Sequence, residues 1–117
     1  LKNFYLGKYL SKKSTKFLMD VLYSTSTGPN KLVEQLPKNA KIAHKTGSSG
    51  KNKDGLTGAE NDIAIITLPN GKHYAISVFV SDSKESETVN CKMISDISKV
   101  VYDGLSNPKN GFFFNWK

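Results

Sequence analysis

The hydrophobic pattern along the chain begins with a helical period. A helix is predicted over residues 14–23 because its apolar side chains recur on one face of such a helix: Phe17, Leu18, Val21 and Leu22. Ser11 or Ser14 can cap its amino end by accepting a hydrogen bond from a backbone N–H. Gly28 and Pro29 then interrupt the pattern, so we expect the helix to end before them.

Three strands are predicted in the middle of the chain, after a short helical turn over 31–36 that ends at Pro37. The strands are expected at residues 41–45, 61–68 and 74–80. The second is rich in β-branched residues, and the third alternates apolar with other side chains. Pro69-Asn70-Gly71 stands between them and is typical of a tight hairpin.

The last predicted element is a long helix that begins after Ser83. Ser83 can cap its amino end, and Glu85 and Glu87 would then lie in the first turn, where the helix dipole favours negative charge. Gly104 is the expected stop. The apolar residues of this helix recur at helical spacing, and we expect them to face the core: Val89, Met93, Ile97, Val100 and Val101.

These elements predict an α+β fold, a three-stranded antiparallel sheet with flanking helices. The second strand carries apolar side chains on both faces, so both faces of the sheet need cover, and the predicted helices are few for that purpose. No linker or internal repeat divides the 117 residues. We therefore interpret residues 1–117 as part of a single domain.

The net charge of +7 suggests an anionic partner such as nucleic acid or a membrane surface. All 17 basic residues are lysine, however, and they are scattered, whereas recognition of bases and phosphates depends heavily on arginine. No apolar run approaches the roughly 20 residues that a membrane helix requires. We expect neither partner, and interpret the lysines as a solvated surface.

The stretch HKTGSSG, residues 44–50, groups polar side chains at the end of the first predicted strand. It presents one cation, Lys45, and the hydroxyls of Thr46 and Ser48 on either side of Gly47. Taken alone, this pattern is also typical of a strand end with a solvated lysine and loop-capping hydroxyls. This stretch alone does not distinguish that structural interpretation from a binding site, so the flanking sequence has to be compared as well.

The wider sequence resembles the carboxy-terminal part of class A serine β-lactamases. The resemblance rests on IAHKTGSSG, on the hairpin NDIAIITLPNGKHYAISVFVSDS and on the amphipathic helix after it, and it runs from about Phe4 to Tyr102. The branch found in Bacteroides-type and related extended-spectrum enzymes is the most similar. The resemblance implies the carboxy-terminal part of a β-lactamase or transpeptidase-like fold.

Of the motifs that this family requires, only Lys-Thr-Gly is present. Ser-Asp-Asn does not occur in these residues, nor does the family's nucleophile-bearing Ser-x-x-Lys helix. Ser81-x-x-Lys84 matches the spelling of the nucleophile motif, but it lies after the last strand, so we interpret it as a coincidence. We therefore expect this segment alone to be inactive.

The resemblance implies that residues 45–48 form one wall of an active-site cleft. Lys45 and Ser48 are the expected catalytic residues. Lys45 would lend positive charge to the substrate carboxylate and to neighbouring serines, and the Ser48 N–H would be one of two oxyanion-hole donors. The hydroxyls of Thr46 and Ser48 would bind the substrate carboxylate, and Gly47 would leave room for the acyl group. The expected substrate-binding residues are thus Lys45, Thr46, Gly47 and Ser48, with no metal and no cofactor.

The chain departs from the family's pattern in substrate binding. Many members clamp the substrate carboxylate with an arginine, which this chain lacks, and Thr67 and Lys72 are poor substitutes. His44 is expected to face away from Lys45 and not to act as a base. Two further residues are expected to have no chemical role: His73, at the surface, and Cys91, a structural residue of the last helix.

The function implied is that of a serine hydrolase that opens β-lactam amides through an acyl-enzyme, in the periplasm or secreted. The expected partners are the β-lactam substrate and the amino-terminal part of the same enzyme, one strand of which would flank residues 74–80. Without that strand, the chain is expected to self-associate through the exposed edge, or to be ordered only beside a complementary amino-terminal segment. Two alternatives stay open: a segment of a penicillin-binding transpeptidase, and a non-catalytic truncated fragment acting only as a folding or association module.

Overall fold

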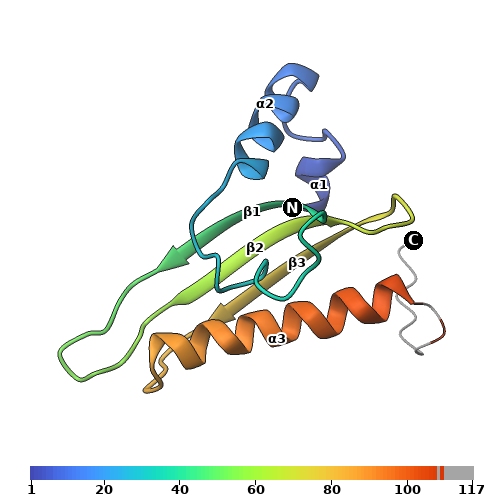
Figure 1. Ribbon diagram of the computed structural model, residues 1–117. Coiled ribbons are helices and arrows are strands. Elements are labelled where there is room, and N and C mark those ends of the chain that lie inside the picture. The colour runs from blue at the N-terminus through green and yellow to red at the C-terminus, as the bar shows by residue number, and fades with distance from the viewer. Residues whose placement is uncertain (108, 110–117) are drawn as a thin grey trace.

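The computed structural model describes residues 1–107 and 109, and it arranges two helices, three strands and a third helix along the chain (Figure 1). The elements are α1 (Lys2–Tyr5), α2 (Lys12–Tyr23), β1 (Lys41–Ser48), β2 (Glu60–Thr67), β3 (His73–Val80) and α3 (Glu87–Ser106). The predicted α+β class and the three-stranded antiparallel sheet are confirmed.

The strands follow the order β1-β2-β3, so β2 is central and both β1 and β3 are edges. The β2–β3 hairpin closes at Pro69-Asn70-Gly71 as predicted. Leu68 N–H donates to the Lys72 carbonyl at 2.8 Å. Gly71 has a φ of 81°, which a glycine adopts without the steric cost that a Cβ would bring.

One face of the sheet packs on α3 and on the turn that follows Pro29. Leu32 of that turn is fully buried, and it joins side chains of β2, β3 and α3 in one hydrophobic core, against which Ile42 of β1 also packs. The core comprises Leu32, Leu36, Ala64, Ile66, Leu68, Tyr74, Ile94 and Tyr102. The turn 29–36 is thereby held between the sheet and the helix.

The opposite face of the sheet is only partly covered. Helices α1 and α2 lie on this side, away from α3 (Figure 1). Ala43 and Ile65, which pair across β1 and β2, are 1% and 2% exposed, whereas Phe79 on β3 is 67% exposed. The predicted shortage of cover is confirmed, and it falls on the β3 side of this face.

Helix α2 begins earlier than predicted because Ser11 provides its cap. The Ser11 hydroxyl accepts a hydrogen bond from the Ser14 N–H at 3.1 Å, so the helix starts at Lys12. The predicted apolar stripe exists, but α2 has no buried residue. Phe17 is 70% exposed, so in this chain the stripe covers no core.

The start and the end of α3 correct the sequence interpretation. Ser86 is the cap, since its hydroxyl accepts from the Val89 N–H at 3.2 Å, and Glu85 therefore lies outside the first turn. Ser83 instead forms an isolated β-bridge with Thr57. Gly104 does not stop the helix; it is buried within the last turn, and the helix continues to Ser106.

The apolar stripe predicted for α3 is wrong for four of its five members. Val89, Met93, Ile97 and Val100 are 40% to 56% exposed, and only Val101 of the predicted stripe packs against the core. The buried face instead carries small or polar residues beside two large ones: Asn90, Cys91, Ile94, Ser95, Ser98, Tyr102 and Gly104. Small side chains let the helix approach the turn 29–36 closely, and the hydroxyls of Ser95 and Ser98 form hydrogen bonds to that turn.

Cys91 is a buried residue of this inner face, at 1% exposure. Burial raises the pKa of its thiol, which keeps the sulfur protonated and unreactive. The expectation that Cys91 is structural agrees with this position. Among residues 1–107 and 109, no helix combines the length and the apolar character needed to cross a membrane.

Candidate active-site strand

The candidate residues Lys45, Thr46, Gly47 and Ser48 occupy the last half of β1, at an edge of the sheet. Because side chains alternate along a strand, Lys45 and Gly47 lie on the face opposite α3, and Thr46 and Ser48 lie on the face that α3 covers. The strand is longer than predicted, so all four residues are held in register against β2, from Ser48 opposite Glu60 to Lys45 opposite Ile63.

Lys45 is exposed, and its ammonium group folds back to donate to the Thr46 carbonyl at 2.6 Å. Gly47 is also exposed, and a Cβ built on it would meet no atom within 4 Å. The surface beside Gly47 is therefore open, with one exposed cation next to it. This is the arrangement that an anionic group lying along the strand would require.

The backbone of Ser48 presents its N–H at the open edge. Ser49 N–H donates to the Ala59 carbonyl of the neighbouring segment at 2.9 Å. On the other side of β1, the His44 carbonyl accepts from the Thr25 hydroxyl at 2.6 Å. Since adjacent residues of an antiparallel strand point their backbone groups to opposite sides, the Ser48 N–H points away from β2.

The Ser48 hydroxyl lies in a polar cluster that the sequence interpretation missed. It donates to the Glu60 carboxylate and accepts from the Lys31 ammonium at 3.1 Å. Lys31 and Glu60 form an ion pair, and each side chain is only 4% exposed. The Lys31 ammonium also donates to the carbonyls of Gly47 at 3.3 Å and Asn61 at 3.2 Å.

Lys31 was not predictable from the local sequence, because a lysine in a polar turn is usually solvated. The only signal was its place directly before Leu32 in an amphipathic turn. The positions considered earlier as substitutes for arginine lie far from this cluster: Thr67 pairs with Lys41 at the other end of β1, and Lys72 is in the hairpin. Asn61, which the sequence did not single out as a substitute, pairs with Gly47 and so lies beside the cluster.

Thr46 contacts the loop after α2. Its hydroxyl forms a hydrogen bond of 2.8 Å with the Thr27 hydroxyl. Gly28 packs against it so closely that a Cβ at Gly28 would lie 2.5 Å from the Thr46 methyl carbon. The loop after α2 therefore holds the Thr46 side chain in place.

His44 is buried and pairs with Asp62 of β2. Its Nδ1 lies 3.1 and 3.2 Å from the two carboxylate oxygens of Asp62. As predicted, His44 shares no face with Lys45. His73 is exposed, bonds the Thr67 hydroxyl at 2.9 Å and packs on the ring of Tyr5, which agrees with the predicted surface position.

The turn 29–36 is fastened to α3 as well as to the sheet. The Ser98 hydroxyl donates to the Leu32 carbonyl at 2.7 Å, and the Gln35 amide donates to Ser95 at 2.9 Å and to Asp96 at 2.6 Å. Hydrogen bonds from the Lys92 ammonium and the Gln35 amide hold the pKa of the Asp96 carboxyl below its usual value. The turn that carries Lys31 is thus a fixed part of the structure.

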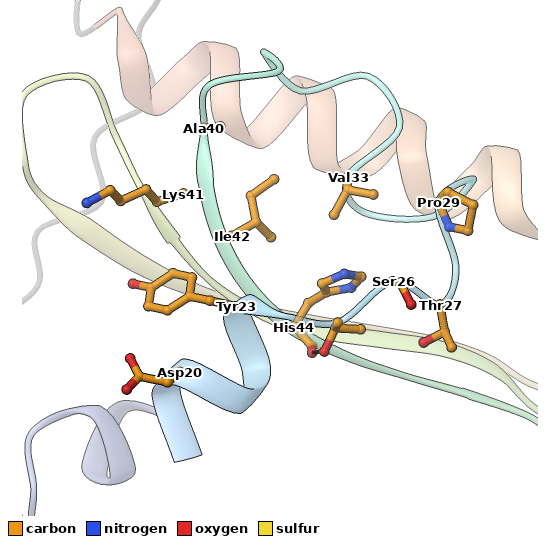
Figure 2. A pocket seen from close by; sticks show the side chains of 11 residues that line it. Asp20, Tyr23, Ser26, Thr27, Pro29, Val33, Ala40, Lys41, Ile42 and His44 are labelled. Carbon is orange, nitrogen blue, oxygen red and sulfur yellow. Dashed lines mark hydrogen bonds between the residues drawn. The ribbon is translucent and has the colours of Figure 1, made fainter. Parts of the chain in front are cut away.

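A cavity of about 730 Å³ lies between the end of α2, the loop after it and the first half of β1 (Figure 2). In Figure 2, α2 contributes Asp20 and Tyr23, and β1 contributes Ile42 and His44. None of the four candidate residues lines it. The candidate site is therefore the open strand edge, and this cavity is a neighbouring feature.

Comparison with known proteins gives one consistent result. A family model described as the Beta-lactamase enzyme family matches residues 1–105. The β-lactamase VEB-1 of Pseudomonas aeruginosa is 52% identical over 101 residues, which cover 86% of this chain and 33% of that protein. A β-lactamase of Bacteroides uniformis is 41% identical over 97 residues, covering 83% of this chain and 33% of the relative.

Solved structures agree with these matches. The TLA-3 extended-spectrum β-lactamase superposes with a TM-score of 0.90 at 53% identity, over 92% of this chain and 39% of that one. A class A β-lactamase from Bacteroides cellulosilyticus gives a TM-score of 0.86 at 40% identity. The match covers 91% of this chain and 38% of that structure's chain. The chain spans about a third of the length of the curated relatives it matches.

We predict that Gly28→Ala lowers stability more than Gly55→Ala does. Both glycines have positive φ, 62° and 76°, so both variants carry the strain of a left-handed alanine, roughly 1–2 kcal/mol. Only at Gly28 does the new Cβ also strike Thr46. Thermal unfolding of the two variants measures the difference. Equal losses would show that Thr46 moves aside at no cost.

Proposed function

The chain belongs to the β-lactamase enzyme family, and from that premise we propose that it forms one wall of the active site of a class A serine β-lactamase. The nucleophile that opens the β-lactam amide and forms the acyl-enzyme would come from an amino-terminal part of the enzyme. The observation that carries the proposal is the Lys45–Ser48 segment on an open sheet edge, with the Ser48 N–H pointing outwards.

Each residue of the segment would have a distinct role. The Ser48 N–H would stabilise the oxyanion of the tetrahedral intermediate, a contact for which one donor is typically worth about 10²–10³ in rate. Lys45 would swing from the Thr46 carbonyl towards the substrate carboxylate and the neighbouring serines. Gly47 would let the acyl group lie against the backbone, since nothing occupies that space.

Recognition of the substrate carboxylate would rest on Lys45 and on hydroxyl groups, because the chain has no arginine. The Ser48 hydroxyl already donates to Glu60, so a bond to substrate requires it to exchange one carboxylate for another. The Thr46 hydroxyl shares a hydrogen bond with Thr27 and can redirect its hydrogen without breaking an ion pair. We therefore propose that the hydroxyl of Thr46, rather than that of Ser48, is the main hydroxyl contact of the substrate carboxylate.

The proposed hydrolase function is tested by completing the enzyme. A chimera joins the amino-terminal part of the VEB-1 relative, which is 52% identical where the two overlap, to this chain. The chimera should hydrolyse a chromogenic cephalosporin, whereas the chain alone should not, because it holds no family nucleophile.

Two results would contradict this proposal. One is a folded chimera without hydrolysis, when VEB-1 itself is active under the same conditions. The other is covalent labelling of the purified chain at a serine by a fluorescent penicillin. If the chimera cross-links peptides but leaves the cephalosporin intact, the transpeptidase alternative replaces hydrolysis. The names of the relatives, all β-lactamases, favour hydrolysis.

In the chimera, Lys45→Ala should reduce kcat/KM more than Ser48→Ala. The first variant removes a charge from the cleft, whereas the second keeps the backbone donor and loses only a hydroxyl. We expect the two to differ by roughly 1–2 kcal/mol, the difference between charged and neutral hydrogen bonds. Steady-state kinetics on the two variants measures this, and equal losses would remove the distinction between them.

We also propose that the chain's partner is the amino-terminal part of the same enzyme, which would cover the free edge of β3. That edge has no lysine or proline between Tyr74 and Val80 to discourage pairing. The exposed stripe of α3, residues 89–100, adds apolar surface that would otherwise face water. Without the partner, the chain would cover these surfaces with copies of itself.

Light scattering at micromolar concentration should therefore detect association of the isolated chain. Phe79→Lys, on edge strand β3, should reduce it more than the matched control Phe17→Lys on α2. The two phenylalanines are similarly exposed, at 67% and 70%, so a general loss of hydrophobicity would affect both alike. A dispersed, well-folded monomer without any partner would overturn the prediction.

A further inference from the structure

Asp62 is an unexpected residue at its position in β2. It lies on the face that packs against α3 and the turn 29–36, and its exposure is 0%. The next residues on the same face, Ala64 and Ile66, belong to the hydrophobic core. A buried carboxylate costs several kcal/mol unless it is paired and hydrogen-bonded, so its contacts need an explanation.

The Asp62 carboxylate joins two separate segments of the chain. Its two oxygens face Nδ1 of His44 in β1, which must carry the hydrogen because an ionised carboxylate only accepts. One of these oxygens also accepts from the backbone N–H of Leu32 at 3.2 Å. The same side chain therefore holds the residue before Lys45 and a residue of the turn 29–36.

The position of Leu32 determines the position of Lys31. The Leu32 side chain is fully buried, its N–H is held by Asp62, and its carbonyl is held by Ser98 of α3. Lys31 is the preceding residue, and its ammonium reaches Ser48 and Glu60. Because Leu32 is fixed by its side chain and at both backbone groups, Lys31 has little freedom to shift along the strand.

We propose that Asp62 is a positioning residue for the active-site strand. It sets the separation between the turn 29–36 and β1, and so places the Lys31 ammonium at Ser48, the residue with the oxyanion donor. The hydrogen bonds of the Asp62 side chain go to His44 of β1 and to Leu32, not to Ser48. We therefore assign its effect on Ser48 to the contact with Leu32, which positions Lys31. This inference rests on the proposed function for its effect on catalysis, but its structural part does not.

A double-mutant cycle in the chimera tests the catalytic part of the proposal. Asp62→Ala should lower kcat/KM on the order of tenfold to a hundredfold, the usual effect of a small misplacement in an active site. In a Lys31→Met background the same change should cost less than about twofold, since the residue through which it acts is gone. Additive losses would overturn the proposal.

The matched control is Ile94→Ala, which removes a fully buried side chain of α3 from the same core. Ile94→Ala should lower the thermal midpoint of unfolding. Its effect on kcat/KM should, however, be the same whether or not the chimera also carries Lys31→Met. Non-additivity of the control as well would mean that the cycle reports lost stability, and the proposal would fail.

Amide spectra of the ¹⁵N-labelled chimera test the structural part without any need for activity. Asp62→Ala should shift the amide signals of Leu32 and Ser48 together, whereas Ile94→Ala should leave Ser48 unshifted. If Asp62→Ala does not fold, Asp62→Asn replaces it, because the carboxamide keeps the shape but is a weaker acceptor, and the same two signals should move less. An unchanged Ser48 signal in the folded variant would overturn the proposal.

The two parts separate the possible failures. An inactive but folded chimera contradicts the proposed function, and the amide spectra then decide on Asp62 by themselves. If the chimera is active but the losses in kcat/KM from Asp62→Ala and Lys31→Met are additive, the proposed function is supported and the positioning role of Asp62 is wrong.

Discussion

The buried ion pair between Lys31 and Glu60 is the interaction on which the geometry of the edge strand depends. Both side chains are 4% exposed, and the ammonium also meets the Ser48 hydroxyl and two backbone carbonyls. Removing either partner would leave a buried charge unpaired, which typically costs about 3–5 kcal/mol. The pair therefore fastens the turn 29–36 to the ends of β1 and β2, where the strands give way to a loop.

The ion pair is part of a polar layer that extends along one face of the β1–β2 ladder. The pair of His44 and Asp62 lies two residues further along, beside the apolar core. Apolar contacts are not directional, so by themselves they allow a turn to slide over a sheet. Hydrogen bonds to fixed partners are directional and prevent such sliding. The layer thus defines where the Lys-Thr-Gly strand lies relative to the turn and to α3.

The surfaces that this chain leaves uncovered agree with the extent of its similarity to known proteins. Within residues 1–107, no strand pairs with the outer edge of β3, and the stripes of α2 and α3 carry large apolar side chains in contact with water. The matched relatives are about three times as long as the matched segment. An apolar stripe is normally evidence of a core, and the exposure of these stripes fits the amino-terminal partner proposed above.

From the sequence alone followed the order of the three strands and the long helix, the Asn-Gly hairpin and the start of the strand that carries Lys45, because these depend on local periodicity and turn chemistry. The family followed from the resemblance of motifs such as Lys-Thr-Gly, whereas the extension of β1 to Ser48 depends on pairing with β2. The sequence did not determine which face of α3 is buried, nor the roles of Lys31, Asp62 and Ser98. Hydrophobicity assigns apolar residues to the inside, but small or charged residues can be buried when distant partners satisfy them. The partner of Ser98 is Leu32, 66 residues away, and only the tertiary structure brings the two together.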